Sequence, residues 1–285
     1  MSGRRRGRGG PQRPDRPDRR GGPRPGRGDG PHADRPDRPD HPDRDAPLGD
    51  DTVLYGRNAV EEALRAGRRR VHRIRATTGA AREPWLSAAG VAVEVVATEE
   101  VARHAGSDAH QGVVADVDPY PYADADDLLA RPAPLIVALD EVQDPQNLGA
   151  ICRTAECAGA DGVVICERRA AHVTAAVAKA SAGAVEHLSV ARVRNLADFL
   201  LAARDAGAWS YGAAVGEGSV PYTEPDYSGG LILVLGAEGK GLRPRVAGAC
   251  DALIALPLHG RIASLNVSAA ASGLLYGILQ KRESA

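Results

Sequence analysis

Three polar or glycine-rich segments follow apolar runs that have the composition of β-strands. They cover residues 139–154, 234–242 and 256–268. In an open parallel sheet, ligands bind beyond the carboxyl ends of the strands, so these segments hold the candidates for chemistry. Their side-chain amides, carboxylates, hydroxyls and guanidinium groups can orient a substrate and offset charge. The candidates are Asn147, Arg153, Glu238, Ser264 and Asn266.

Taken one at a time, these residues also fit ordinary structural roles. Asn147 has the type of a helix N-cap, and Arg153 that of an exposed helical residue. Either Ser264 or Asn266 could cap a final helix. The functional interpretation therefore depends on the candidates acting together.

Glycines surround the carboxylate of the second segment, Gly236-Ala237-Glu238-Gly239-Lys240-Gly241. They permit positive φ and close approach of a ligand to the backbone, although a plain tight turn would need them too. The segment is not a phosphate loop, because Gly241 stands where that motif needs Ser or Thr. No strand of this part leads into a dinucleotide fingerprint, which disfavours a nucleotide-dependent dehydrogenase.

The elements that must position these segments follow from the apolar pattern. Continuous apolar strands alternate with helices, which predicts an α/β fold with a mostly parallel sheet covered by helices on both faces. Strands are expected at 135–139, 162–166, 188–193, 209–215, 231–235 and 252–256. Helices are expected at 148–158, 174–181, 196–206 and 266–281. We assign 135–285 to this domain.

The remainder divides into three stretches. Residues 1–50 are rich in Arg, Pro, Asp and Gly and cannot bury enough apolar area to offset their ordering entropy, so we predict a disordered tail. Residues 51–118 alternate short helical and strand patterns, which predicts a small α/β domain. Residues 119–134 contain four prolines and an acidic cluster, which indicates a linker.

Charge and composition exclude several classes. The chain has 36 basic and 37 acidic residues, so it is not a general polyanion binder. It has no run of about 20 apolar residues and no apolar secretion signal, so we expect no membrane partner and a cytoplasmic location. The four cysteines form no C-x-x-C pair, which predicts reduced core thiols and no metal site.

A local basic run departs from that balanced charge. It spans residues 65–75, and its Arg68, Arg69, Arg70 and Arg73 could contact RNA phosphates. The alternative is a solvated helix end and turn, which the sequence alone favours slightly.

Together and in this order, the three segments resemble the signature motifs of the SpoU/TrmH family, the ribose 2′-O-methyltransferases of the SPOUT superfamily. The first matches N-x-G-x-x-x-R-T, the second G-x-E-G-x-G, and the third P-x-x-G followed by S-L-N-V-S. Each motif alone is weak, whereas the three together are specific. The phrases at 55–60 and 110–113 also resemble the RNA-binding domain of RlmB-like members, which act on a guanosine of 23S rRNA.

The resemblance implies a deep trefoil knot, a homodimer and S-adenosylmethionine as the methyl donor. It places the reacting ribose and donor among Arg153, Asn147, Glu238, Ser264 and Asn266. Carried over motif by motif, the donor would be held by Leu235, Gly236, Leu256, Leu258, Gly260 and Leu265. The RNA would also contact Arg57. Because a guanidinium stays protonated, we expect Arg153 to act as a fixed positive charge on the target phosphate and 2′-oxygen.

Two alternatives stay open. The same reaction could act on another rRNA nucleotide, as in members that confer antibiotic resistance, or on tRNA. A protein of a different class, an inactive RNA-binding protein of the same fold, is disfavoured because the polar positions of all three motifs are present.

Overall fold

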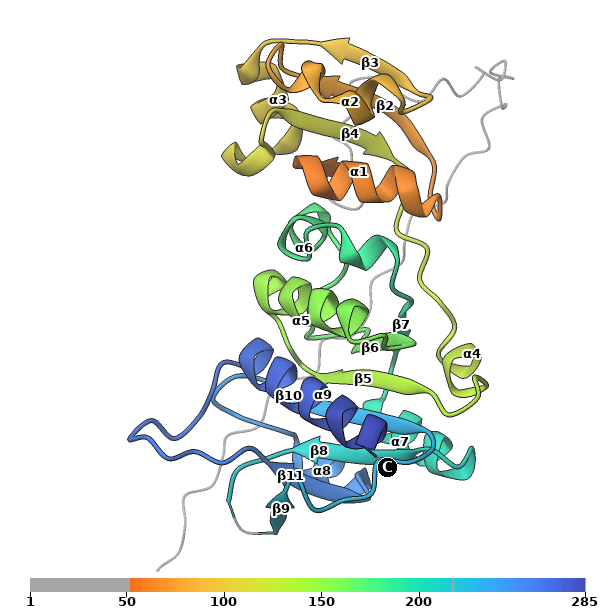
Figure 1. Ribbon diagram of the computed structural model, residues 1–285, viewed down its shortest axis with the longest axis vertical. Coiled ribbons are helices and arrows are strands. Elements are labelled where there is room, and N and C mark those ends of the chain that lie inside the picture. The colour runs from red at the N-terminus through yellow and green to blue at the C-terminus, as the bar shows by residue number, and fades with distance from the viewer. Residues whose placement is uncertain (1–51, 217, 285) are drawn as a thin grey trace, which may run out of the picture. The chain divides into compact units, whose positions relative to one another are not determined.

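The computed structural model of the chain describes residues 52–216 and 218–284 (Figure 1). The stretch for which the sequence predicts a disordered tail lies outside the described residues. Two sheets organise the described part, one within residues 53–117 and one within residues 135–255. The predicted α/β fold class is confirmed.

The first sheet has four strands in the order β1-β4-β2-β3. Strand β4 runs antiparallel to β1 and β2, and β3 runs parallel to β2. The strands are β1 (Val53–Tyr55), β2 (Val71–Ala76), β3 (Ala92–Val95) and β4 (Val113–Val117). The helices are α1 (Arg57–Ala66), α2 (Pro84–Ser87) and α3 (Thr98–Ala105), with the 3₁₀ turns η1 (Ala80–Arg82) and η2 (Asp108–His110). Helix α1 ends at Gly67, where a left-handed residue terminates it as the sequence predicts.

The second sheet has seven strands in the order β7-β6-β5-β10-β8-β11-β9, and every pair is parallel. The strands are β5 (Leu135–Asp140), β6 (Gly162–Cys166), β7 (Val190–Val193), β8 (Trp209–Ala213), β9 (Ser219–Pro221), β10 (Leu231–Gly236) and β11 (Ala252–Ala255). The helices are α5 (Pro145–Cys157), α6 (Ala175–Ala180), α7 (Leu196–Asp205), α8 (Pro244–Ala249) and α9 (Val267–Ser284), with the 3₁₀ turn η3 (Ala184–Glu186). The trefoil knot implied by the resemblance stays a prediction.

Both faces of this sheet are buried, which is why its central strands are continuous apolar runs. In β5, Leu135, Val137 and Leu139 belong to one hydrophobic cluster. The alternate residues Ile136 and Ala138 belong to a second cluster. Because successive side chains of a strand point to opposite faces, the two clusters lie on opposite sides of the sheet.

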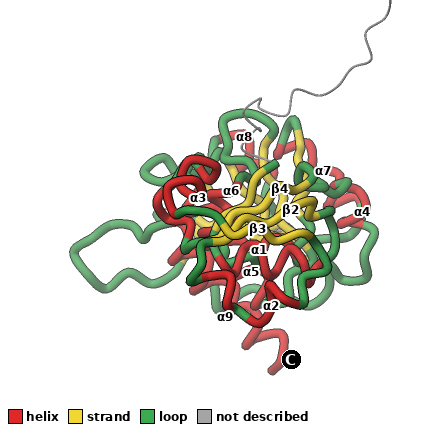
Figure 2. The backbone as a smooth tube through the Cα atoms, turned by 90° about the horizontal axis from the view of Figure 1, so that it is seen from above, coloured by secondary structure: helices red, strands yellow, loops and turns green. Residues whose placement is uncertain are grey.

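Helices cover each face of the second sheet. In Figure 2, seen from above, the labelled strands β2, β3 and β4 belong to the first sheet. Side chains of α5, α6 and α9 join the first cluster, and those of α7 and α8 join the second. The two-sided cover expected from the sequence is therefore present. Among the described residues, no helix combines the length and the apolar character that crossing a bilayer requires.

The stretch 119–134, expected to be a linker, packs on the second sheet instead. It contains a helix, α4 (Ala125–Leu129), whose Leu128 is 1% exposed. The hydroxyl of Tyr120 donates to the carbonyls of Val185 (3.0 Å) and Leu188 (2.7 Å). The prolines that suggested a linker divide this stretch into short pieces. Each piece is too short to show the periodic apolar pattern of a helix or strand.

Arg69 is buried in an ion pair that joins the first sheet's domain to η3. Its Nε donates to Oε2 of Glu186 at 3.0 Å, and its Nη2 donates to Oε1. The two side chains are only 3% and 1% exposed. The prediction that Arg69 contacts RNA is therefore wrong, because its guanidinium is already enclosed and neutralised.

The other arginines of the basic run differ from one another. Arg68 is half-buried and donates to the carbonyl of Leu188, a structural contact. Arg73 is exposed and lies 3.3 Å from Glu94. Arg70 is exposed and forms no ion pair with a described residue. Contacts with residues distant in the chain thus neutralise or enclose some of the arginines that form one basic run in the sequence.

All four cysteines are free, as the sequence predicts. Cys152 and Cys166 are buried, and burial raises the pKa of the Cys152 thiol to about 12. Cys157 is exposed, so the prediction that every cysteine is a core thiol is wrong for this residue. It lies on the outer face of α5, which the sequence pattern did not resolve.

The buried ion pair yields a stability prediction. Arg69→Ala leaves the Glu186 carboxylate buried without its cation, which costs about 3–5 kcal/mol. The neighbouring variant Arg70→Ala, on an exposed side chain, should change the free energy of unfolding by about 0.5 kcal/mol or less. Urea denaturation of the two variants measures the difference. Equal stabilities would show that the Arg69–Glu186 pair contributes nothing.

Candidate active site

Side chains from all three signature segments meet in one hydrogen-bonded cluster. Nδ2 of Asn147 donates to Oε1 of Glu238 at 3.1 Å. Nδ2 of Asn266 donates to Oδ1 of Asn147 at 3.0 Å and to Oε1 of Glu238 at 2.5 Å. Residues up to 119 positions apart in the chain thus close a triangle, which we call the Asn–Glu–Asn cluster.

Helix α5 positions Asn147 in its first turn. The N-cap is Asp144, whose Oδ1 accepts from the N–H of Gln146 at 2.9 Å. The ordinary role considered for Asn147, a helix N-cap, is therefore wrong. Asn147 is only 6% exposed, so its amide is held for the cluster rather than for the helix end.

Asn266 serves two purposes at the start of α9. Its Oδ1 accepts from the N–H and the hydroxyl of Ser268, at 2.8 and 2.6 Å, and from the N–H of Ala269 at 3.3 Å. These contacts satisfy N–H groups that the first turn of a helix leaves without partners. The opposite end of the same amide, Nδ2, donates into the Asn–Glu–Asn cluster. The orientation of α9 and the geometry of the cluster are therefore coupled.

A tight loop after β10 carries Glu238. The N–H of Gly241 donates to the carbonyl of Ala237 at 2.9 Å, and both Gly239 and Gly241 have positive φ. A Cβ on Gly236 would lie 2.2 Å from the backbone carbon of Gly241. Glycine is therefore required at Gly236, because the loop folds back directly over it.

An ion pair missed by sequence reasoning links the first segment to Arg243, the residue directly after the second segment. Asp140, at the end of β5, has a side chain that is 0% exposed. Its two oxygens accept from the backbone N–H of Arg243 at 2.8 Å and from its Nε at 2.7 Å. This hydrogen bonding raises the pKa of the Arg243 guanidinium. A carboxylate ending a fully apolar strand, Leu-Ile-Val-Ala-Leu-Asp, was the signal that could have revealed the pair.

Arg153 and Ser264 are not brought into the cluster by any hydrogen bond or ion pair within the described residues. Arg153 is exposed on α5, six residues after Asn147, so the two side chains leave the helix about 120° apart. Ser264 is exposed in the loop before α9. Of the five predicted catalytic residues, three therefore converge and two lie outside the cluster.

The residues predicted to hold the methyl donor lie at the end of β10 and in the loop after β11. Leu235 is buried, whereas Leu258 is half-buried and Leu265 is 49% exposed. Leu256 lies under α9, 3.3 Å from where a Cβ on Gly273 would stand. Gly260 is exposed. Some residues of this set are therefore buried, and others lie in an open loop.

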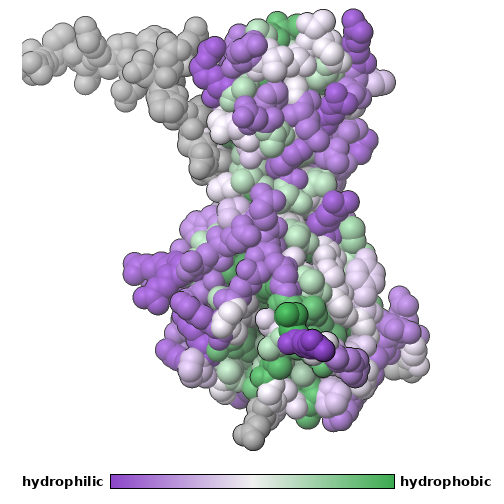
Figure 3. All heavy atoms as spheres, turned by 90° about the vertical axis from the view of Figure 1, so that its left-hand side faces the viewer, coloured by the Kyte–Doolittle hydropathy of each residue, from purple (hydrophilic) through white to green (hydrophobic). Residues whose placement is uncertain are grey.

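The open loops have the chemistry that S-adenosylmethionine needs. Nothing lies within 4 Å of a Cβ built on Gly239, Gly241 or Gly260, so a ligand can approach the bare backbone there. Ile262 and Leu265 are apolar side chains with exposures of 76% and 49%, which an adenine ring would cover. This loop protrudes at the left of Figure 1, and Figure 3 shows hydrophobic side chains at the surface on that side. The residues predicted to hold the methyl donor therefore fit S-adenosylmethionine.

Among the residues that the structure describes, no group of three or more His, Cys, Asp or Glu side chains could hold a metal ion. The carboxylates near the cluster have other partners. Glu238 accepts from two amides, and Asp140 is paired with Arg243.

Two family models match the chain. The SpoU rRNA methylase family matches residues 134–276. The RNA 2′-O ribose methyltransferase substrate-binding family matches residues 53–123. The first match contains every member of the Asn–Glu–Asn cluster, and the second contains the four-stranded sheet.

Similar proteins agree with these models. An uncharacterized tRNA/rRNA methyltransferase of Mycolicibacterium vanbaalenii is 40% identical over 255 residues, which is 83% of this chain and 79% of the relative. The AdoMet-bound rRNA methyltransferase from Sinorhizobium meliloti has a TM-score of 0.69 at 29% identity, over 80% of this chain and 87% of that one. The SpoU methyltransferase AviRb from Streptomyces viridochromogenes, in complex with AdoMet, has a TM-score of 0.70 at 25% identity, over 82% and 91%.

The two purposes of Asn266 can be separated by substitution. Asn266→Ala removes the N-cap of α9 and should lower the free energy of unfolding by about 0.5–2 kcal/mol. Asn266→Ser keeps a capping oxygen but is too short to reach Asn147 and Glu238, so it should recover most of that loss. Urea denaturation measures both variants. A serine variant as unstable as the alanine variant would show that the cluster, not the cap, holds α9 in place.

Proposed function

Because the chain belongs to the SpoU family of S-adenosylmethionine-dependent RNA methyltransferases, we propose that it methylates a ribose 2′-hydroxyl of ribosomal RNA, at a guanosine of 23S rRNA. The matches confirm the family and the cofactor that the three motifs suggested. The description of the substrate-binding model supports the ribose hydroxyl, and that of the methylase model supports ribosomal RNA. The RlmB-like phrases support the guanosine.

One observation carries this proposal. The Asn–Glu–Asn cluster joins the ends of α5, β10 and α9 through three hydrogen bonds, although the residues lie in separate segments. An RNA-binding protein without catalysis would have no need for this convergence. Transfer RNA is the second candidate substrate, because a relative is named a tRNA/rRNA methyltransferase.

A ribose 2′-hydroxyl is a poor nucleophile at neutral pH, so the chain must align it with the methyl donor. S-adenosylmethionine supplies an electrophilic methyl group on a sulfonium sulfur. Holding reactants in line can contribute roughly 7–11 kcal/mol in the most favourable intramolecular cases. The Asn–Glu–Asn cluster contributes to this by fixing the relative positions of the three loops, and Ser264 helps to hold them.

Glu238 and Arg153 receive different roles. Oε1 of Glu238 accepts from both amides, which leaves Oε2 of this exposed side chain to accept from a ribose hydroxyl. Arg153 contacts the target phosphate and the 2′-oxygen as a fixed positive charge, which favours loss of the hydroxyl proton. Its exposure on α5 leaves it free to meet the RNA.

The enzyme acts as a homodimer, with the site near the subunit boundary. Helices α5 and α9 lie together, since the hydroxyls of Thr154 and Ser272 are 3.0 Å apart. Part of their exposed surface carries small or amphipathic side chains, so a second copy can approach closely there. This part includes Ala269, Gly273 and Tyr276 on α9 and Arg153 and Cys157 on α5.

The first domain holds the RNA, with Arg57, Arg70 and Arg73 as exposed cations and Arg68 half-buried beside them. Phosphate attraction requires accessible positive charge, which these residues offer and Arg69 does not. Ribosomal RNA as the substrate places the enzyme in the cytoplasm.

Mapping of 2′-O-methylation across total RNA, from cells with and without the gene, tests the proposed function. Loss of one mark at a 23S rRNA guanosine is the expected result, and restoring the gene should restore the mark. A mark lost from tRNA alone would replace ribosomal RNA with the second candidate. If no 2′-O-methyl group changes, the proposed reaction is refuted.

A further inference from the structure

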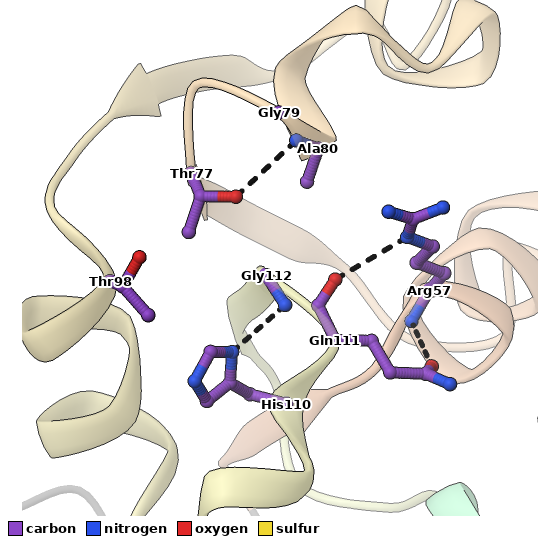
Figure 4. A pocket seen from close by; sticks show the side chains of 8 residues that line it. All are labelled: Arg57, Thr77, Gly79, Ala80, Thr98, His110, Gln111 and Gly112. Carbon is purple, nitrogen blue, oxygen red and sulfur yellow. Dashed lines mark hydrogen bonds between the residues drawn. The ribbon is translucent and has the colours of Figure 1, made fainter.

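A pocket in the first domain lies away from the Asn–Glu–Asn cluster. It is an open hollow of about 510 Å³. Figure 4 shows that two segments singled out by the sequence, one at Arg57 and one at His110 to Gly112, meet here. The lining residues are Arg57, Thr77, Gly79, Ala80, Thr98, His110, Gln111 and Gly112.

His110 is a buried side chain with one nitrogen left for a ligand. It is 7% exposed, and its Nδ1 accepts from the N–H of Gly112 at 2.8 Å. An accepting Nδ1 carries no proton, so the neutral ring carries its proton on Nε2 and can donate from there. Every fully buried side-chain nitrogen and oxygen of the described residues has a partner. Nε2 of His110 makes no hydrogen bond within them, so it is not fully buried, and it points away from Gly112 in the residue set that lines the pocket (Figure 4).

The wall that holds His110 is rigid. Gln111 adopts a left-handed conformation at φ 53°, which a residue with a side chain rarely occupies and which tends to occur at functional sites. Its Oε1 accepts from the N–H of Arg57 at 3.2 Å, and its carbonyl accepts from Nε of Arg57 at 3.3 Å. A Cβ on Gly112 would lie 2.6 Å from Oγ1 of Thr77, so the turn also packs tightly against the residue that follows β2.

Two further side chains of the lining, those of Thr98 and Arg57, can donate hydrogen bonds. Thr98 is exposed at the start of α3, with a hydroxyl that makes no hydrogen bond to a described residue. Arg57 is paired with Glu83 at 2.5 Å, but both side chains are substantially exposed, at 45% and 32%. Such a pair contributes little to stability, so a phosphate can compete for the guanidinium. The pocket therefore favours a ligand rich in acceptors.

We propose that this pocket binds one unpaired nucleotide of the substrate RNA. This proposal rests on the proposed function, because it takes the RNA to be the substrate of methylation. Nε2 of His110 and the hydroxyl of Thr98 donate to acceptors on the base, and Arg57 at the rim contacts the phosphate. An unpaired base exposes these acceptors, whereas a base within an A-form helix faces a narrow, deep groove. The pocket thus selects RNA that presents an unpaired nucleotide to the first domain.

Two substitutions remove the proposed donors with little change in structure. His110→Asn retains an acceptor for the N–H of Gly112 but lacks the Nε2 donor. Thr98→Val removes one exposed hydroxyl and keeps the side-chain shape, so it stays informative if the His110 variant does not fold. Arg103→Gln is the matched control, because it removes a positive charge from α3 at an exposed residue outside the pocket lining.

Fluorescence anisotropy on the full chain tests the proposal with a labelled single-stranded RNA of about 12 nucleotides and with the same strand in a duplex. Each pocket variant should weaken single-strand binding roughly three- to tenfold, as loss of one hydrogen bond predicts, and leave duplex binding unchanged. S-adenosylmethionine binding should not change in any variant. Arg103→Gln should weaken binding of the single strand and the duplex to the same small extent.

Three results would overturn the proposal. The pocket variants could bind the single strand as tightly as the original chain, or they could lose single-strand and duplex binding equally. Free AMP or UMP could displace the labelled RNA at micromolar concentration, which would assign the pocket to a free nucleotide. Since this assay needs no methyl transfer, failure of the proposed reaction would instead be seen in the methylation map.

Discussion

The Asn–Glu–Asn cluster is the interaction on which the site depends. Its members come from three segments, and each is anchored elsewhere: Asn147 by α5, Asn266 by its cap on α9, and Glu238 by the turn after β10. The buried carboxylate of Asp140 pairs with Arg243 and so connects the first segment to the end of the second a further time. A methyl-transfer site made from loops can be precise only if the loops hold one another in this way.

The parallel sheet explains why these loops meet at all. Strands β5 and β10 are adjacent and parallel, so the segments that follow them leave the same edge. Their burial on both faces fixes the strand register, because a shift by one residue would exchange the two hydrophobic clusters. The Arg69–Glu186 pair and the hydroxyl of Tyr120 join the first domain and the stretch that follows it to residues 185–188 of the second domain.

Sequence reasoning succeeded where a signal was local and failed where a partner was distant. Apolar runs such as Leu231–Gly236 predicted the central strands, and three joint motifs predicted the cluster. Arg69 looked like part of a basic patch, because its partner Glu186 lies 117 residues away. Short elements such as β9 and α4 escaped notice because a few residues carry no period. The Asp140–Arg243 pair was missed for the same reason as the Arg69 pair.

The central claim is that the cluster aligns the methyl donor with a ribose hydroxyl, and the most direct test is methyl transfer by a variant that keeps the helix cap. Transfer from radiolabelled S-adenosylmethionine to rRNA from cells lacking the gene should label a 2′-O-methylnucleotide. Asn266→Ser, once shown to be folded, should transfer on the order of 100-fold more slowly, since small misplacements have effects of that size. Transfer by Asn266→Ser at the original rate would contradict the account.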